Sequence, residues 1–394
     1  MVPKLRFGGF KEEWTMTLLS KLATKITDGT HDTPDTTSEG VPYLTAIHVK
    51  DGYIDYKNCY YLDKLTHSFI YKRCNPEKND LLIVNIGAGT GTCALNTVDY
   101  EFSLKNVALV KPNKNKIYPF YLLQVQRKNA KKLFHELTSG GAQPFLSLKE
   151  IGKIKIPLCQ YDEQTKIADF LSSVDDKITL LNQQYDLLCQ YKKGMMQKIF
   201  NQELRFKDEN GEEFPEWNYD EISSLFSNKS KKYNPLSGIN YPCIEMDCIS
   251  QRDGQLLTTL DSTQQQSIKN VFKKGDVLFG KLRPYLRKYI LATFDGVCSS
   301  EIWVFKGILI NNSYLYQFIQ TDFFINLANK STGSKMPRAD WDTISSTFVF
   351  YPCLEEQSKI ANFLSALDDK IAVKKAELDK LKTWKQGLLQ QMFV

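Results

Sequence analysis

The chain lacks the cysteine and apolar patterns that mark secreted, zinc-binding and membrane proteins. Its nine cysteines include no C-x-x-C pair, which favours reduced thiols in a cytoplasm over a disulfide framework or a zinc site. No run reaches the roughly 18 apolar residues of a membrane span. The opening residues, MVPKLRFGGF, have no apolar signal core. We therefore expect a cytoplasmic protein with no membrane partner.

Motifs for catalysis are also absent. The four histidines have no metal-ligand spacing. The segment IGAGTGT at 86–92 lacks the Lys-Ser/Thr end of a phosphate loop, so we interpret it as a glycine-rich turn that can approach DNA. NPEK at 75–78 and NPLS at 234–237 lack the second proline and the aromatic residue of an amino-methyltransferase motif, and the carboxylates have no nuclease spacing. We predict no catalytic site, no metal site and no cofactor in this chain.

One sequence pattern occurs twice. DEQTKIADFLSSVDDKI at 162–178 matches EEQSKIANFLSALDDKI at 355–371 at twelve of seventeen positions, with an offset of 193 residues. A second pair, KLRFGGFKEEW at 4–14 and ELRFKDENGEEFPEW at 203–217, shares Leu-Arg-Phe and the final tryptophan. We call the segments 4–14 and 203–217 the leads. The second lead follows Phe200, and the matching residue Phe393 stands at the end of the sequence, where the first lead would follow if the chain were closed. The repeat is therefore cyclic. This pattern predicts two related halves around a pseudo-two-fold axis, with the termini close together.

Each copy of the first repeat predicts a long helix. From Glu163 to Phe200 there is no proline, and apolar residues recur at alternating steps of four and three, as in a coiled coil. Such a helix is about 57 Å long. We favour antiparallel pairing of the two helices within the chain over two separate oligomerisation zippers, because each apolar seam then buries the other. In the second copy Lys374 and Lys385 interrupt the seam. The seam residues are Ile167, Leu171, Val174, Ile178, Leu181, Tyr185 and Leu188, then Ile360, Leu364, Leu367, Ile371, Leu378, Leu381, Leu388 and Met392.

The windows 15–155 and 218–350 carry short β-type runs, such as DLLIVNIG and GDVLFGKL, and then a helix-like run. The formal charges of these windows are +6 and +3, whereas 156–200 has −1. Basic clusters occur in both windows, around Arg127 and in KLRPYLRK at 281–288. Such clusters neutralise phosphates, while arginine forks bind guanine edges. A solvated charged surface explains one cluster equally well, but clusters in both windows favour DNA contact.

Taken together, these motifs resemble those of the specificity subunit of type I restriction–modification systems. The resemblance rests on the duplicated EQ(T/S)KIA(D/N)FL…DDKI segments, the LRF…EW leads, GDVLFGKLRPYL and the Gly-x-x-x-Pro exits, and it covers essentially the whole chain. It implies an α+β protein, in which two α/β target-recognition domains are joined by two long antiparallel coiled-coil helices. The expected segments are target-recognition domains at 1–155 and 201–350, a central spacer helix at 156–200, and a C-terminal helix at 351–394 that pairs with 163–200.

The resemblance also implies partners. Each recognition domain would read one half of a bipartite, asymmetric site in double-stranded DNA. Two methyltransferase subunits and restriction/translocase subunits would perform methylation and cleavage, and they would bind S-adenosylmethionine, ATP and Mg²⁺. Because one turn of DNA is about 34 Å, the helix pair would act as a ruler for the spacer between the half-sites.

Individual DNA contacts can also be predicted, and Gly140 and Gly333 are expected to shape the loops before the helices. Two other functions remain open: a coiled-coil scaffold whose β modules bind protein, and a self-sufficient DNA methyltransferase or nuclease, which the absent motifs disfavour. The predicted DNA-binding residues are Thr30, His31, Thr90, Lys105 and Gln143 in the first domain, and Lys281, Arg283, Arg287, Lys335 and Arg338 in the second.

Overall fold

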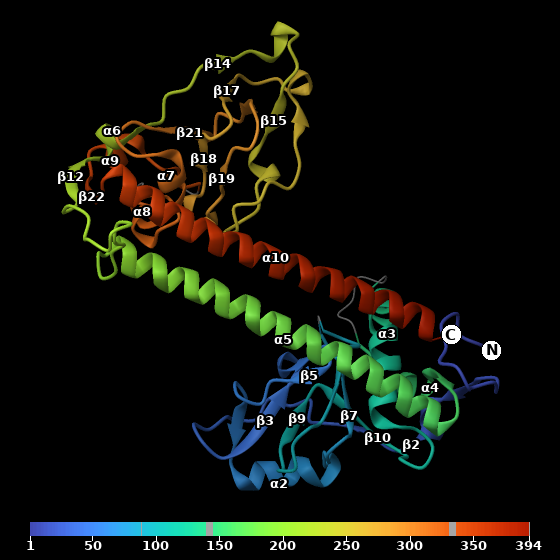
Figure 1. The fold of residues 1–394 in the computed structure, drawn as a ribbon. Helices are drawn as coiled ribbons and strands as arrows, with labels where there is room; N and C mark the ends of the chain where they lie inside the picture. The colour runs from blue at the N-terminus through green and yellow to red at the C-terminus, as the bar shows by residue number, and fades with distance from the viewer. Residues whose placement is uncertain (88, 139–144, 331–335, 394) are drawn as a thin grey trace. The chain divides into compact units, whose positions relative to one another are not determined.

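The computed structural model describes residues 1–87, 89–138, 145–330 and 336–393, without the side chains of 131–132 and 134–138. The chain forms two compact units (Figure 1). Unit 1 comprises Met1–Gln183 and Ala376–Val394, and unit 2 comprises Gln184–Lys375. Helices α5 (Tyr161–Phe200) and α10 (Leu354–Met392) contribute residues to both units. No helix in the described part of the chain has the length and hydropathy of a membrane span.

Unit 1 is built around a four-stranded antiparallel sheet with the strand order β2-β10-β7-β8. A smaller sheet, β6-β3-β9, contains the parallel pair β3/β9. The elements before α5 are β1 (Thr15–Leu18), α1 (Leu19–Leu22), β2 (Ala23–Asp28), β3 (Val41–Thr45), η1 (Ala46–His48), β4 (Val49–Lys50), β5 (Tyr53–Ile54), β6 (Tyr60–Leu62), α2 (Lys64–Arg73), β7 (Leu81–Val84), β8 (Cys93–Leu95), β9 (Ser103–Lys105), β10 (Val107–Pro112), α3 (Pro119–Thr138), α4 (Leu148–Lys153) and β11 (Lys155–Leu158).

The central sheet of unit 1 is covered on both faces, which explains the unbroken apolar run of β7. Leu81 and Ile83 point into the core that also contains residues of α3 and α5. Leu82 and Val84 point into a second core with Leu44 and other residues of the smaller sheet. All four β7 side chains are fully buried, as expected for a strand without a solvent face.

Unit 2 repeats this element order with little shared sequence. Its central sheet is β13-β21-β18-β19, and β15/β20 form the parallel pair that corresponds to β3/β9. The predicted helix-like run after β21 is split into α7 and α8, because Thr321 starts a new helix by accepting a hydrogen bond from the backbone N–H of Phe324. The elements are β12 (Asn218–Glu221), α6 (Ile222–Leu225), β13 (Phe226–Ser227), β14 (Lys232–Tyr233), η2 (Pro235–Ser237), β15 (Pro242–Ile244), η3 (Met246–Cys248), β16 (Leu260–Asp261), η4 (Ser262–Gln264), β17 (Lys269–Phe272), β18 (Val277–Gly280), η5 (Pro284–Leu286), β19 (Tyr289–Leu291), β20 (Gly296–Cys298), β21 (Ile302–Gly307), α7 (Asn312–Phe318), α8 (Asp322–Ala328), α9 (Trp341–Ser345) and β22 (Phe348–Tyr351).

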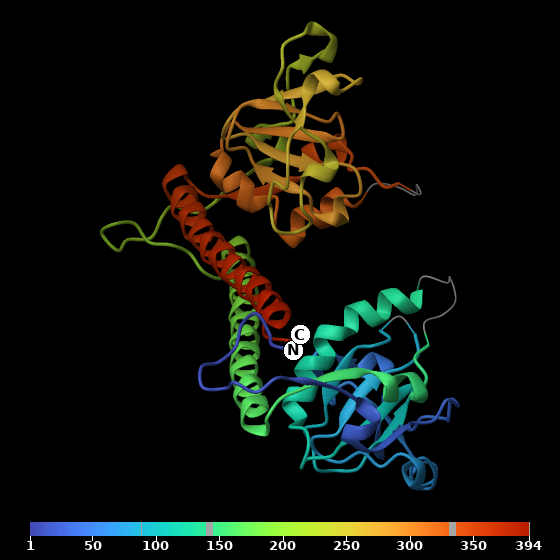
Figure 2. The ribbon, with the colours of Figure 1, turned by 90° about the vertical axis from the view of Figure 1, so that its right-hand side faces the viewer.

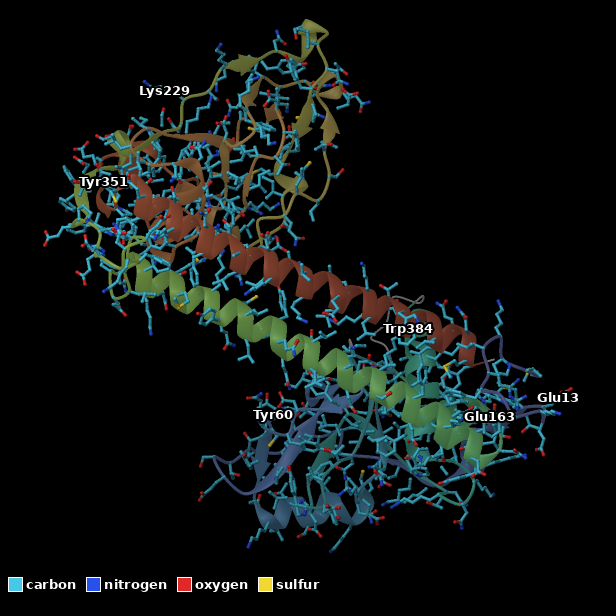
Figure 3. The ribbon with its side chains drawn as sticks, viewed as in Figure 1. Glu13, Tyr60, Glu163, Lys229, Tyr351 and Trp384 are labelled. Atoms are coloured by element: carbon cyan, nitrogen blue, oxygen red, sulfur yellow. The ribbon has the colours of Figure 1, made fainter. Side chains whose placement is uncertain are left out.

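The glutamate of the repeated Glu-Gln dipeptide joins each lead segment to its helix. Glu163, at the first turn of α5 (Figure 3), is fully buried and accepts hydrogen bonds from Arg6 at 2.6 and 2.8 Å and from Trp14 Nε1 at 3.2 Å. In unit 2, Glu356 accepts the same bonds from Arg205 and Trp217. A buried carboxylate needs such donors, so these contacts account for the shared Glu, Arg and Trp of the sequence repeat.

The helix seams pack within each unit, as predicted. In unit 1, Leu171 and Val174 of α5 share a core with Leu388 and Met392 of α10. In unit 2, Leu364 and Leu367 of the predicted α10 seam share a core with Met196 and Ile199 of α5, which lie beyond the predicted α5 seam. The chain ends lie side by side in unit 1 (Figure 2), where the backbone N–H of Leu5 donates to the carbonyl of Gln391.

Two sequence expectations need correction. The segments predicted as helix from 156 and from 351 begin as strands β11 and β22, and the helices start at Tyr161 and Leu354. This is because residues 155–158 and 348–351 pair with β1 and β12. Lys385 does not interrupt the seam either: it is buried and pairs with Asp175.

Candidate functional site

Four of the predicted DNA contacts of the first domain lie at one edge of the unit 1 sheet. β2 and β7 end there, and β8 and β10 begin there, because Asp28 pairs with Ala108, Val84 with Val107, and Cys93 with Ile83. The connecting segments at this edge carry Thr30 and His31, Thr90, and Lys105. We call these segments the unit-1 edge. Gln143 and Gly140 lie outside the described residues.

Thr30 and Lys105 are held together by backbone pairing. They form a parallel β-bridge, and the backbone N–H of Thr30 donates to the carbonyl of Leu104 at 2.8 Å. Lys105 is partly exposed, and its ammonium donates to the hydroxyl of Thr33. Since this contact has no desolvated anion, the ammonium can exchange it for a phosphate at little cost.

His31 is held by two neighbours. Its Nε2 lies 2.8 Å from Asp28 Oδ2, and its Nδ1 lies 3.2 Å from Asn106 Oδ1. The buried Asp28 carboxylate also pairs with Arg73. Both ring nitrogens of His31 are therefore engaged inside the protein, so this arrangement favours a clamp between β2 and β10 over a direct contact to a base. His31 as a DNA-binding residue stays a prediction.

Residues 85–87 and 89–92 belong to the tight connection between β7 and β8. Thr90 is buried, and its hydroxyl donates to the carbonyl of Gly87 at 2.7 Å. Gly91 adopts φ +92°, and a Cβ there would come within 3.2 Å of the Ala130 carbonyl oxygen, so this position requires glycine. Next to the turn, Asn85 is buried and its Oδ1 has no hydrogen-bond partner in the described part of the chain. Thr90 thus shapes the turn, and Asn85 is the side chain with unused hydrogen-bonding capacity.

The corresponding edge of unit 2 is rich in arginine and lysine. β18 ends there at Gly280, opposite Ile302 of β21, and β19 begins at Tyr289. The segment 281–288 between β18 and β19 corresponds to 85–92 of unit 1, and its Leu282 forms a β-bridge with Arg338, as Ile86 does with Phe145. We call 281–288, Glu301 and Arg338 the unit-2 edge. Lys335 and Gly333 lie outside the described residues.

Three of the predicted basic residues come together at the unit-2 edge. The backbone of Lys281 bonds to Glu301 and Ala339, and the backbone N–H of Arg283 donates to Pro337. Within the described part of the chain, neither the Lys281 ammonium nor the Arg283 guanidinium forms a hydrogen bond or an ion pair. Arg338 pairs with Glu301 at 3.0 Å and is 56% exposed. Two cationic groups at this edge thus have no partner among residues 1–87, 89–138, 145–330 and 336–393, and they are available for a phosphate or base contact.

Arg287 lies in a different environment. Its guanidinium pairs with Asp322 at the start of α8, and it lines a cavity of about 900 Å³ with Lys192, Tyr316 and other residues of unit 2. This pairing lowers the pKa of Asp322 below its ordinary value, so the carboxylate stays ionised and holds the arginine. Arg287 as a DNA contact stays a prediction, although its head group is engaged within the protein.

The backbone at both edges contains unusual conformations. Arg283 and Arg287 have φ of 51° and 52°, and Asn106 has φ of 55°. This left-handed region is costly for a long side chain such as arginine. Strained residues of this kind cluster at functional sites, so the conformation of segment 281–288 supports its selection as the candidate site.

Sequence reasoning missed Asn106, Asp28 and Glu301. The side chains of Asn106 and Asp28 orient His31, and Glu301 orients Arg338. Glu301 is 37 residues from Arg338 along the chain, and no periodicity relates the two. Asn106 had one usable signal, since it stands alone between two β-type runs, where asparagine tolerates the left-handed conformation.

The two edges offer different chemistry on the same framework. The unit-1 edge presents amide and hydroxyl groups with one lysine, and the unit-2 edge presents guanidinium and ammonium groups. Asparagine is suited to adenine and arginine to guanine in the DNA major groove. No group of three or more metal-ligating side chains occurs among the described residues. The arrangement therefore suits hydrogen bonding to two different surfaces.

Comparison with known proteins identifies relatives over nearly the whole chain. The family model "Type I restriction modification DNA specificity domain" matches twice, at residues 11–190 and 215–383. The type I restriction enzyme MjaVIII specificity subunit of Methanocaldococcus jannaschii is 27% identical, covering 86% of this chain and 85% of that protein. The type I restriction enzyme EcoDI specificity subunit of Escherichia coli is 25% identical over 63% of this chain and 62% of its own.

The fold has solved counterparts. The S subunit of a type I restriction–modification system from M. genitalium superimposes with a TM-score of 0.61 over 100% of this chain and 99% of that chain, at 16% sequence identity. A chain from a study of complex assembly and conformational transition in the type I R-M system gives a TM-score of 0.52 at 14% identity and 98% coverage of both chains. At such low identity, the likeness concerns the fold.

Proposed function

This chain belongs to the type I restriction–modification DNA specificity family, and from this membership we propose that each unit reads one half of a bipartite, asymmetric DNA site. The observation that carries the proposal is the pair of equivalent sheet edges with different side chains. The shared framework would present both edges to DNA in a similar way. The different donors at the unit-1 edge and unit-2 edge would select different base sequences.

Within this proposal the segments divide as follows. Residues 1–155 and 201–350 are the two target-recognition domains, 156–200 is the spacer segment with α5, and 351–394 contains α10, which pairs with 163–200. Phosphate contacts would come from Lys105 and Lys281, and base contacts from Arg283 and Arg338 with help from Thr30. His31, Thr90 and Arg287 would act by holding these segments in place. Gln143 and Lys335 remain proposed contacts on sequence grounds alone.

The chemistry would belong to partner subunits. We propose that the chain assembles on double-stranded DNA with two methyltransferase subunits and with restriction/translocase subunits, in a cytoplasmic complex. S-adenosylmethionine, ATP and Mg²⁺ would bind to those partners. The support is the family membership together with the absence of catalytic motifs from the sequence. The exposed faces of α5 and α10, rather than their apolar seams, would dock the methyltransferase subunits.

Mapping of methylated positions tests this function. The chain is co-expressed with its cognate methyltransferase subunits, and the methylated bases of the host DNA are sequenced. We expect one bipartite motif with two different halves, and none when this chain is omitted. Methylation by the isolated chain would contradict the non-catalytic role, and a motif that does not depend on this chain would contradict the reading role.

DNA binding separates this function from that of a protein-binding scaffold. The complex should bind DNA with an affinity that falls steeply as salt rises, because lysine and arginine contacts to phosphate release counterions. A complex that assembles fully but binds its methylation site no better than unrelated DNA, at every salt concentration, would favour the scaffold.

A further inference from the structure

Each unit contains a polar cluster at the place where its recognition module meets the two long helices. The unit-1 junction consists of Asp175 on α5, Lys385 on α10, and Gln124 and Arg127 on α3. The unit-2 junction consists of Lys192 on α5, Asp368 on α10, Gln317 on α7, and Gln320 just after α7. Each residue of the unit-1 junction has its counterpart 193 positions away, the offset of the sequence repeat.

In the unit-1 junction, one carboxylate joins three helices. Asp175 Oδ1 pairs with the Lys385 ammonium. Its Oδ2 accepts hydrogen bonds from Arg127 Nη1 at 2.7 Å and from Gln124 Nε2 at 3.0 Å. Arg127 also binds both carboxylate oxygens of Asp51, in the turn between β4 and β5, at 2.7 and 3.0 Å. The α5/α10 pair and the recognition module are therefore connected through a single group.

The unit-2 junction repeats the arrangement. Lys192 Nζ lies 2.6 Å from Asp368 Oδ1 and 2.9 Å from Gln320 Oε1. Gln317 Nε2 donates to Asp368 Oδ2 at 3.1 Å. The difference is at the fourth position, where Gln320 replaces Arg127. A neutral amide here means that the junction holds one cation and one anion.

Both lysines are almost fully buried, with 8% of Lys192 and 5% of Lys385 exposed. Burial lowers the pKa of both ammonium groups below the ordinary lysine value, and the paired aspartates offset only part of this effect. The aspartates are less buried, with 27% of the Asp175 side chain and 36% of the Asp368 side chain exposed. A largely desolvated pair of this kind adds little net stability over a well-packed apolar pair, whereas a buried lysine without its carboxylate is strongly unfavourable. The effect of each pair is therefore to disfavour other registers of the two helices and other orientations of the recognition module.

Two alternatives are excluded. If α5 slid along α10 by a heptad, each lysine would lose its aspartate and stay in the seam without a facing carboxylate. If a recognition module rotated on its helices, Gln124 and Arg127, or Gln317, would lose the shared carboxylate. An apolar seam by itself would tolerate both changes far better, as one polar residue in a coiled-coil seam is known to specify its register.

We propose that the two junctions determine spacer selectivity: they hold each recognition module in one orientation on its own helix segments, so that the complex accepts a narrow range of spacer lengths. The junction residues are positioning residues, since none lies at an edge proposed to contact DNA. This inference rests on the proposed function, because spacer selectivity has meaning only for a bipartite DNA site.

The test measures spacer selectivity in the assembled methyltransferase complex. The substrates are DNA duplexes with the two mapped half-sites and spacers that differ by single base pairs. The variant Lys192→Met with Asp368→Leu replaces the ion pair by apolar side chains. We expect the preference for the best spacer over neighbouring lengths to fall by about tenfold or more, with the same half-sites recognised. The control, Lys273→Met with Asp295→Leu, removes an exposed pair of the same unit and should keep the wild-type preference.

A charge exchange tests positioning more strictly. In Lys192→Asp with Asp368→Lys, both glutamine amides can rotate to exchange donor and acceptor, so spacer preference should return to near the wild-type value. If the apolar pair does not fold, Gln317→Met gives the same measurement with the ion pair intact and should also broaden the preference. The inference would be overturned if the apolar-pair variant and Gln317→Met both fold and keep the wild-type spacer preference. It would also be overturned if the charge-exchange variant folds but accepts as wide a range of spacer lengths as the apolar-pair variant. Wild-type complex without any bipartite preference would instead overturn the proposed function.

Discussion

At the scale of single residues, the unit-2 edge is proposed to make two kinds of DNA contact, to phosphates and to bases, and mutations can distinguish them. Lys281→Ala should weaken binding to all sequences about equally and lower the salt slope by about one, because it removes one phosphate contact. Arg283→Ala should instead relax selection at one base position, at a cost of about 1–3 kcal/mol against the preferred base. Competition binding with single-base variants of the site measures both effects. As the control, Lys273→Ala lies before the opposite end of β18 and should change neither. A uniform loss for Arg283→Ala would contradict base reading.

Asp175 predicts a dependence of stability on pH. Burial raises the pKa of this carboxyl, but Arg127 and Lys385 more than offset it, and the pKa lies below the ordinary 3.8. The stabilisation from Asp175 is therefore complete above its unfolded pKa and is lost as the pH falls through the lowered pKa. Asp175→Asn should destabilise the protein most at neutral pH, and the difference from wild type should shrink towards pH 3. Urea unfolding between pH 7 and pH 3 checks this, with the exposed Asp176→Asn as control; a constant difference would contradict it.

Residue types at the edges could be predicted from sequence only in part. Thr30, Thr90 and Lys281 stand in turn segments next to strong β-type runs, and Lys105 ends the strand β9; the structure places all four at sheet edges. Their partners could not be predicted, because antiparallel pairing joins residues that are far apart in the chain. Asn106 and His31, for example, are 75 residues apart and meet because β10 pairs with β2.

At the scale of elements, the repeated apolar seam should contribute similarly in both units. Leu171 and Leu364 are counterparts, and both are fully buried. Replacement of either by alanine leaves a cavity and should lower the free energy of unfolding by about 2–5 kcal/mol. Leu180→Ala, at an exposed position of α5, should cost less than about 0.5 kcal/mol. Denaturant unfolding measures all three. A small effect for Leu171→Ala or Leu364→Ala would contradict seam packing in that unit.

Helix length gives a second prediction at this scale. Removal of one heptad from α5 together with one from α10 keeps the apolar pattern in register and shortens each helix by about 10 Å. We expect the methyltransferase complex to prefer a shorter spacer between unchanged half-sites. Methylation of a spacer library measures this preference. Removal of a heptad from α5 alone should disrupt the seam, and an unchanged spacer after the paired deletion would exclude the ruler.

The helices and their pairing were predictable because alternating steps of four and three leave few other solutions. The boundaries of the elements were harder to predict from the sequence. Strands β11 and β22 occupy the first residues of the predicted helical segments, because they pair with β1 and β12. The sequence also suggested that Lys385 breaks the seam. A buried lysine is rare without a partner, and its partner Asp175, 210 residues away, carries no local signal.

At the scale of the whole molecule, one chain carries the same framework twice with different recognition surfaces. The duplicated contacts of glutamate with arginine and tryptophan, together with the two junctions, preserve the framework. The edges differ because the loops that form them are free to change without loss of the core. This separation explains how sequence identity can be confined to the helices and leads while the element order is retained in both windows.

The central claim is that the two units read DNA independently. Exchange of residues 218–350 for the corresponding window of another family member, followed by mapping of methylated positions in cells with the matching methyltransferase subunits, tests it most directly. The account predicts that the half-site read by unit 2 changes, while the other half-site and the spacer stay the same. A change in both half-sites, or in neither, with the exchanged chain folded and assembled, would contradict it.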